Sequence, residues 1–320
     1  MSDFVQQQHS VCRFDSSESW VILSPIEQSI KRKIEAAGIP LKDWDIQINY
    51  GIKTGCNEAF IISTEKRTEI LANCKDDAER QRTDELIRPI LRGRDIKRYG
   101  YDWANLYLIA TFPACHYNID DYPAVKDYLL SFAEDNLRDA DYDWVADNYL
   151  ADFCMQKLSQ TGKFIEIAGQ RIVIGTTSEK ARKKTSNKWY ETQDSISYWD
   201  DFSKPKIIYN DIAQQLTFAL CQNGEFLNNT AYFFTSDKEH VLEFLLKALN
   251  TKVLDWYYRT LSVQLGEKAV RMFSIYVLKL PIPYGNLKAL DSLDDDSMIN
   301  RCLCSMYGMT EEEIDFIENQ

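Results

Sequence analysis

The chain has 320 residues, of which 45% are hydrophobic and 27% are charged, so it has the composition of a globular protein with one large or two modest domains. This composition excludes a disordered tail, and the polar start from Met1 to Gln8 and the lack of a long apolar run argue against a signal peptide and a membrane span. A net charge of −12 argues against DNA binding unless the acids are segregated.

The acids are in fact concentrated in two segments. Residues 134–152 contain seven acids and one base, and residues 286–320 contain nine acids and two bases. Their local charges of −6 and −7 leave about +1 for the rest of the chain. The remaining body can therefore carry a basic face.

The first predicted element is a helix after Ser24. Residues 24–27 form a capping box with proline at the first helical position, and isoleucines continue on one face as far as Gly38. A second helix is expected after Pro123. Runs of β-formers predict strands at residues 46–50, 59–63, 106–111, 164–167, 171–174, 206–210, 216–221 and 231–234.

The last elements combine turn and capping signals. Asn223 and Gly224 predict a two-residue hairpin between residues 218–221 and 225–227. A capping box at residues 236–239 precedes an apolar face that predicts one long helix from Val241 to Tyr257. A third box, at residues 310–313, starts a short C-terminal helix. The mixture predicts an α+β fold of small mixed sheets with packed helices.

Two polar turns stand out between these elements. Gly51 and Gly55 bracket a short loop with Lys53, Thr54 and Asn57, where glycine permits a sharp turn and a close approach to another backbone. We name residues 51–57 the glycine loop. Such a loop can offer N–H groups and a cation to a phosphate, or be an ordinary hairpin turn.

The second turn is strongly basic. Arg92, Arg94, Lys97 and Arg98 crowd around Gly93, and we name residues 92–98 the basic turn. It is either a phosphate-binding element or an ordinary solvated loop. A further cluster of basic and polar residues at Arg182, Lys183, Lys184, Asn187 and Lys188 leaves the same alternatives open.

The glycine loop and the basic turn lie in segments 48–62 and 90–99, which resemble the start of the TaqI-like target recognition domain of type IIG restriction-modification enzymes and adenine methyltransferases. Later segments keep the same order along the chain, at residues 122–125, 187–190, 204–209, 228–232, 249–254 and 280–283. The resemblance implies a helical linker or docking segment at 1–45, a recognition domain at 46–285 with an acidic insertion around 134–155, and an acidic helical segment at 286–320.

The motifs of catalysis are not found in the sequence. No two glycines form G-x-G and no Pro-Pro occurs, whereas an adenine methyltransferase needs a glycine-rich cofactor loop and a proline-containing loop for the flipped base. No carboxylate cluster has the spacing of a metal-dependent nuclease. Eight cysteines without a C-x-x-C pair argue against zinc and favour a reducing cytoplasm. S-adenosylmethionine and Mg²⁺ are therefore expected only in a catalytic portion outside this chain.

We interpret the chain as a domain that reads double-stranded DNA for a methyltransferase or endonuclease portion, in cis or in trans, and that has no catalytic centre of its own. Lysine and arginine would contact phosphates or guanine, and asparagine or glutamine would contact adenine. The expected contact residues are Lys53, Thr54, Asn57, Arg92, Arg94, Lys97, Arg98, Arg182, Lys183, Lys184, Asn187 and Lys188. The alternatives are an acidic protein-protein or DNA-mimic module, and an enzyme of unrecognised mechanism.

Overall fold

The computed structural model describes residues 23–134, 144–145, 149–159, 164–173, 186–238, 240–262, 264–265 and 269–320. Its described helices are α2 (Pro25–Ala37), α3 (Asn57–Phe60), α4 (Thr64–Ala72), α5 (Asp77–Leu86), α6 (Pro123–Glu134), α8 (Leu150–Ser159), α9 (Val241–Leu249), α10 (Lys252–Leu261), α11 (Ser274–Val277), α12 (Asp296–Met306) and α13 (Glu311–Glu318). Its described strands are β1 (Gly38–Pro40), β2 (Gln47–Tyr50), β3 (Ile61–Ser63), β4 (Ile87–Leu91), β5 (Leu106–Ile109), β6 (Phe164–Ile167), β7 (Gln170–Val173), β8 (Lys206–Asn210), β9 (Ile212–Ala213), β10 (Phe218–Cys221), β11 (Phe226–Leu227), β12 (Ala231–Thr235), β13 (Gln264–Leu265), β14 (Ala269–Arg271) and β15 (Pro281–Pro283). The predicted α+β class is confirmed.

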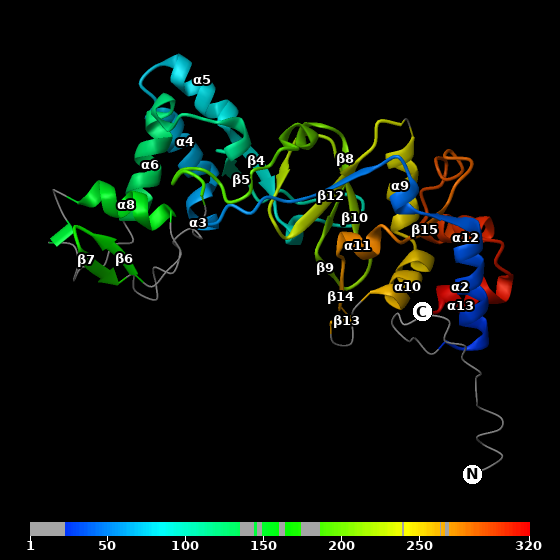
Figure 1. Ribbon diagram of the computed structural model, residues 1–320. Coiled ribbons are helices and arrows are strands. Elements are labelled where there is room, and N and C mark those ends of the chain that lie inside the picture. The colour runs from blue at the N-terminus through cyan, green and yellow to red at the C-terminus, as the bar shows by residue number, and fades with distance from the viewer. Residues whose placement is uncertain are drawn as a thin grey trace, which may run out of the picture.

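An antiparallel sheet occupies the middle of the molecule, in the order β10-β8-β12-β2. Figure 1 shows helices α3 to α6 on one side of this sheet and helices α9, α10, α12 and α13 on the other. The sheet therefore separates two helical regions that are far apart in the sequence.

The two faces of this sheet belong to two different hydrophobic cores. Side chains alternate along a strand. In β8, Ile208 packs into the first core, which is shared with α3 to α6. Ile207 and Tyr209 pack into the second core, which is shared with α9 to α13. Phe233 and Phe234 of β12 divide in the same way. Both strands are thus buried on both faces, which explains their nearly continuous apolar sequence.

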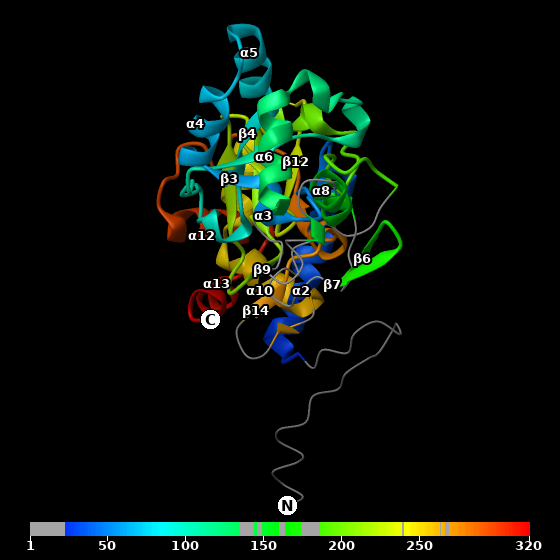
Figure 2. The ribbon, with the colours of Figure 1, turned by 90° about the vertical axis from the view of Figure 1, so that its left-hand side faces the viewer.

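A second sheet, in the order β11-β4-β5-β3, extends from the first toward helices α3 to α6. Strand β11 pairs parallel to β4, with Phe226 opposite Ile90 and Leu227 opposite Leu91. Figure 2 shows α6 in front of this region, with α4 and α5 above it and to its left in the view. The β11–β4 pairing places residue 228 beside residue 92.

Helix α2 joins the C-terminal helices. Ile30 and Ile34 are fully buried in the second core, and β1 pairs with β15 through Ile39 and Ile282. Glu313 of α13 accepts hydrogen bonds from Ser29 and Lys33 of α2. The first described segment and residues 286–320 therefore share one core, while the division of the chain into three domains remains a prediction.

Several predicted local signals are confirmed. Glu27 accepts a hydrogen bond from the Ser24 N–H at the start of α2, and Glu313 accepts one from the Thr310 N–H at the start of α13. Helix α6 begins at Pro123. Capping boxes act within a few residues, so they are readable without knowledge of the tertiary structure.

Two predictions were wrong. The segments on either side of Gly224 do not form a hairpin: Gly224 turns with φ +78°, but β10 pairs with β8 and β11 pairs with β4. The long helix is two helices, α9 and α10, because the Asn250 side chain bonds the backbone of Phe218 in β10 and ends the first one. Long-range partners decided both outcomes.

Other elements differ from the sequence-based expectation in extent. Helix α9 begins at Val241, after His240 with φ +63°, rather than directly after Ser236, and Glu239 lies outside the described residues. Helix α3 takes the first two residues of the strand expected at 59–63. Helices α4, α5 and α12 and strand β4 were not predicted. In the described ranges, none of the helices has the length and apolarity needed to cross a lipid bilayer.

Candidate nucleic-acid interface

The glycine loop packs tightly against β11 and the residues that follow it, including Asn228. The N–H of Gly51 donates to the carbonyl of Ala231, and the N–H of Ile52 donates to that of Leu227. A Cβ atom on Gly51 would overlap the carbonyl oxygen of Asn228 and lie 2.5 Å from its carbonyl carbon. Gly55 has φ +83°, a left-handed conformation that favours glycine. The expected close approach to another backbone is confirmed.

The polar residues of the glycine loop have different environments. Thr54 is buried and donates its hydroxyl to Asn57 Oδ1 at 2.7 Å, so it orients Asn57 rather than facing solvent. Asn57 is exposed. Lys53 is exposed too, with its ammonium 5.9 Å from the centre of the Tyr50 ring and its backbone bonded to Asp194.

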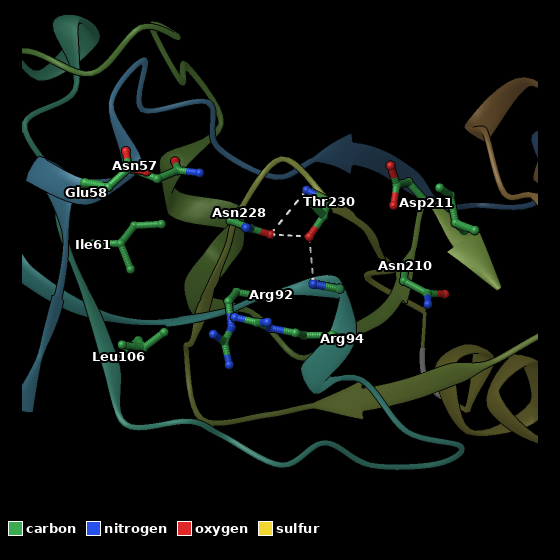
Figure 3. Close-up of a pocket in the computed structure, with 12 residues that line it drawn as sticks. Asn57, Glu58, Ile61, Arg92, Arg94, Leu106, Asn210, Asp211, Asn228 and Thr230 are labelled. Carbon is green, nitrogen blue, oxygen red and sulfur yellow. Dashed lines mark hydrogen bonds between the residues drawn. The ribbon is translucent and has the colours of Figure 1, made fainter. Parts of the chain in front are cut away.

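The basic turn is anchored to the chain that follows β11 (Figure 3). The N–H of Gly93 donates to Thr230 Oγ1 at 2.8 Å, and that hydroxyl donates to Asn228 Oδ1 at 2.6 Å. A Cβ atom on Gly93 would lie 2.5 Å from the carbonyl oxygen of Thr230. Glycine is therefore needed here for the turn to lie against residues 228–230.

The four cations of the basic turn are not equivalent. Arg92 makes two hydrogen bonds to the buried carboxylate of Asp95, which raises the pKa of Arg92. Arg98 is 3.0 Å from Asp296 and donates to the carbonyl of Asn250, so its guanidinium is held by the C-terminal region. Arg94 and Lys97 are exposed. These two are the cations of the turn best placed to meet a ligand.

Two adjoining hollows flank the basic turn, and together we name them the groove. The first has a volume of about 690 Å³ and is lined by Asn57, Glu58, Ile61, Arg92, Gly93, Arg94, Leu106, Asn210, Asp211, Ile212, Asn228 and Thr230. The second has a volume of about 750 Å³ and is lined by Gly93, Arg94, Ile96, Lys97, Asn210, Ile212, Ala213, Gln214, Gln215, Thr217 and Arg259. Gly93, Arg94, Asn210 and Ile212 line both hollows.

The groove is polar and carries charges of both signs. Four cations, Arg92, Arg94, Lys97 and Arg259, line it together with two carboxylates, Glu58 and Asp211. Burial raises the pKa of Asp211 above its ordinary value, with Arg271 opposing this effect. Arg92 and Arg259 are paired with Asp95 and Asp255, which reduces the positive charge that the lining presents to a ligand.

The structure brings Asn57, Arg92, Arg94 and Lys97 together at the groove. It does not bring Lys53, Thr54 or Arg98 into the groove lining. Asn187 donates to the carbonyls of Thr192 and Gln193, and exposed Lys188 lies 5.6 Å from the Tyr190 ring centre. Neither of them lines the groove. Arg182, Lys183 and Lys184 lie outside the described residues.

Much of the groove was not identified from the sequence. Its other wall presents amide and hydroxyl side chains, from Asn210, Gln214, Gln215, Asn228 and Thr230. The Oδ1 atom of Asn210 is buried and has no hydrogen-bond partner among the described residues. Segments 204–209 and 228–232 are among the motifs that carry the family resemblance. The sequence does not reveal, however, that the ends of these two segments lie beside the basic turn. Only the arrangement of β8 and β12 in the fold shows this.

Comparisons with solved structures give low similarity. The type IIL restriction-modification enzyme MmeI, in complex with DNA, has a TM-score of 0.48 at 11% identity, with 88% of this chain and 35% of that chain covered. The type IIG restriction endonuclease BpuSI has a TM-score of 0.42 at 10% identity, with 90% and 28% covered. The present chain thus spans about a third of the length of these enzymes. No curated protein matches it.

A family model gives the informative match. The model of the TaqI-like C-terminal specificity domain matches residues 151–282. This segment includes all the residues of the amide-rich wall of the groove, namely Asn210, Gln214, Gln215, Asn228 and Thr230. Residues 151–282 therefore match the family of TaqI-like C-terminal specificity domains, which confirms for that segment the resemblance found in the sequence.

Proposed function

We propose that this chain is a DNA target recognition domain that gives sequence specificity to a restriction-modification enzyme or an adenine methyltransferase. The observation that carries the proposal is the construction of the groove. Part of its lining comes from the segment that matches a specificity domain, and Arg92 and Arg94 of the adjoining basic turn line it too. Hydrogen-bonding amides thus lie beside cations in one polar concavity.

The groove has side chains suited to both parts of DNA recognition. Lys97 and the exposed Arg94 can neutralise phosphates, or Arg94 can donate two hydrogen bonds to guanine. Asn57, Gln214 and Gln215 are exposed amides, which pair well with adenine. Arg92 is already paired with Asp95, so it would mainly shape the turn.

Catalysis would come from a methyltransferase or endonuclease portion, in cis or in trans, which would bind S-adenosylmethionine and Mg²⁺. The present chain would position that portion on double-stranded DNA in the cytoplasm. This assignment rests on the sequence, because neither a cofactor loop nor a nuclease carboxylate motif occurs in it.

The acidity of the C-terminal segment is partly neutralised within the fold, which favours DNA reading over the acidic-module alternative. Arg301 pairs with Glu311 and Glu318, and lies 3.8 Å from Asp315. Lys33 pairs with Glu313 at 2.7 Å. These carboxylates stabilise the helices that carry them and are not all available to another protein.

Selection from a pool of random duplexes tests the proposed function. The whole chain would be mixed with labelled duplexes of about 20 base pairs at low salt, because phosphate contacts weaken as salt rises. Bound molecules would then be amplified and sequenced. Enrichment of a defined motif supports sequence recognition. Retention of duplex without any enrichment, or no retention at all, contradicts it.

Replacing Arg94 with alanine is expected to weaken binding to the enriched duplex by about 1–3 kcal/mol if Arg94 contacts guanine. A phosphate contact would instead weaken binding to all duplexes and reduce the log–log salt slope by about 0.9. Fluorescence anisotropy over a salt series distinguishes the two. Arg94 is a cleaner probe than Arg92, whose loss would leave the buried Asp95 carboxylate without its partner.

The matched control is Arg32→Ala. Arg32 is also exposed, and it lies on α2 outside the groove, so its removal changes the net charge equally. Equal losses in the two variants would mean that only net charge matters. Full affinity of Arg94→Ala would remove the basic turn from the interface.

A further inference from the structure

The basic turn is held at its two ends by different parts of the fold. At its start, Gly93 bonds Thr230, and Arg92 bonds Asp95. Near its far end, Lys97 and Gly100, two residues beyond the turn, bond each other through their backbones in both directions. Neither contact fixes the position of the far end relative to the rest of the molecule, so that end needs an attachment of its own.

The far end is attached at Arg98 and Tyr99. Tyr99 has φ +70°, a left-handed conformation that costs a non-glycine residue free energy and persists only where the surroundings enforce it. Its N–H donates to the carbonyl of Phe218 in β10 at 2.9 Å. The side chains of both residues then converge on a single acid, since Tyr99 Oη donates to Asp296 Oδ1 at 2.5 Å and Arg98 lies 3.0 Å from Asp296 Oδ2.

The acid that receives them is itself rigidly placed. Asp296 is the first residue of α12, where the helix dipole favours a carboxylate. The helix is fixed by Ile299, Leu303 and Cys304, which are buried in the second core. One carboxylate therefore connects the end of the basic turn to a well-packed helix 197 residues away in the sequence.

We infer that Asp296 is a positioning residue for DNA binding, which acts through Arg98 and Tyr99 to hold Arg94 and Lys97 at the groove. The inference rests on the proposed function. It assigns a supporting role to an acid in the segment whose charge opposes DNA. Arg98, which is engaged by Asp296 and Asn250, belongs to this attachment rather than to the lining of the groove.

If Asp296 has a positioning role, its replacement changes the DNA affinity in the direction opposite to the one that charge alone predicts. Asp296→Asn removes a negative charge, which by Coulomb attraction should tighten the binding of a polyanion. The new amide, however, has only one acceptor oxygen and no charge, so it cannot accept from both Arg98 and Tyr99, and the ion pair with Arg98 is lost. If Asp296 positions the turn, the variant binds DNA more weakly despite its more favourable net charge.

The test measures affinity and salt slope for the full-length chain with the duplex enriched from the random pool. Asp296→Asn is expected to bind about threefold more weakly, with a slope shallower by about 0.9 for each phosphate that the turn no longer neutralises. The control is Glu312→Gln, an exposed acid of the same segment, which should bind as tightly as the unmodified chain or slightly more tightly. Global destabilisation alone would leave the slope of the folded fraction unchanged.

A second variant covers the possibility that Asp296→Asn does not fold. Tyr99→Phe removes only the hydroxyl that donates to Asp296, without a change of charge, and should shift affinity and slope in the same direction. Unchanged affinity and slope in Tyr99→Phe, or affinity in folded Asp296→Asn equal to or above that of the unmodified chain, would overturn the inference. Failure of the unmodified chain to bind any duplex would instead contradict the proposed function.

Discussion

Replacing Gly51 with alanine is expected to lower the free energy of unfolding by about 3 kcal/mol. The added methyl group would overlap the backbone carbonyl of Asn228, and a backbone atom in a sheet cannot move aside as the end of a side chain can. Either the hydrogen bonds from Gly51 to Ala231 and from Ile52 to Leu227 must break, or the segment around Asn228 must shift. Urea denaturation followed by circular dichroism measures the change.

Gly100→Ala provides the matched control. Gly100 lies next to the basic turn, and a Cβ atom there would meet nothing within 4 Å. The same chemical change should therefore leave the urea midpoint nearly unchanged. A loss of similar size in both variants would point to backbone flexibility as the cause, and no loss in Gly51→Ala would contradict the close packing of the glycine loop.

Replacing Glu313 with glutamine is expected to lower the free energy of unfolding by about 2–3 kcal/mol at neutral pH. Although burial opposes its ionisation, hydrogen bonds from Lys33 and Ser29 lower the pKa of Glu313 to about 2 from an ordinary value of 4.5. A carboxylate with a lowered pKa stabilises the folded state fully above its unfolded-state pKa. That contribution is lost as the pH falls through the folded-state value.

The difference between the unmodified chain and Glu313→Gln should therefore be constant above about pH 5 and shrink between about pH 4.5 and pH 2. Urea denaturation at a series of pH values measures it. The neighbouring Glu312 is exposed, so Glu312→Gln should have little effect at any of these values. A pH-independent difference for Glu313→Gln would show that packing, rather than the charge, carries its contribution.

The packing of α12 and α13 also decides how the acidic C-terminal segment can be studied. Leu303 and Ile317 are fully buried in the second core, together with Ile30 and Ile34 of α2. Deleting the segment would expose that core, so changes in DNA affinity after deletion would mix electrostatics with unfolding. Single substitutions of exposed acids separate the two effects.

The sequence by itself determined the features that depend on neighbours a few residues apart. Capping boxes marked the starts of α2 and α13, and runs of β-formers located β8, β10 and β12. Gly51 and Gly55 indicated a loop capable of a tight backbone approach, although its partner could not be identified. Ordered motifs gave the resemblance that the family match confirms for residues 151–282.

Only the tertiary structure decided which distant residues meet. The parallel pairing of β11 with β4 overrode the hairpin signal at Gly224 and brought residues 228–230 to the basic turn. Contacts across the fold also divided four neighbouring cations into two that are held by acids, Arg92 and Arg98, and two that are exposed. Local sequence cannot encode these outcomes, because each depends on a partner brought close by strand pairing or helix packing.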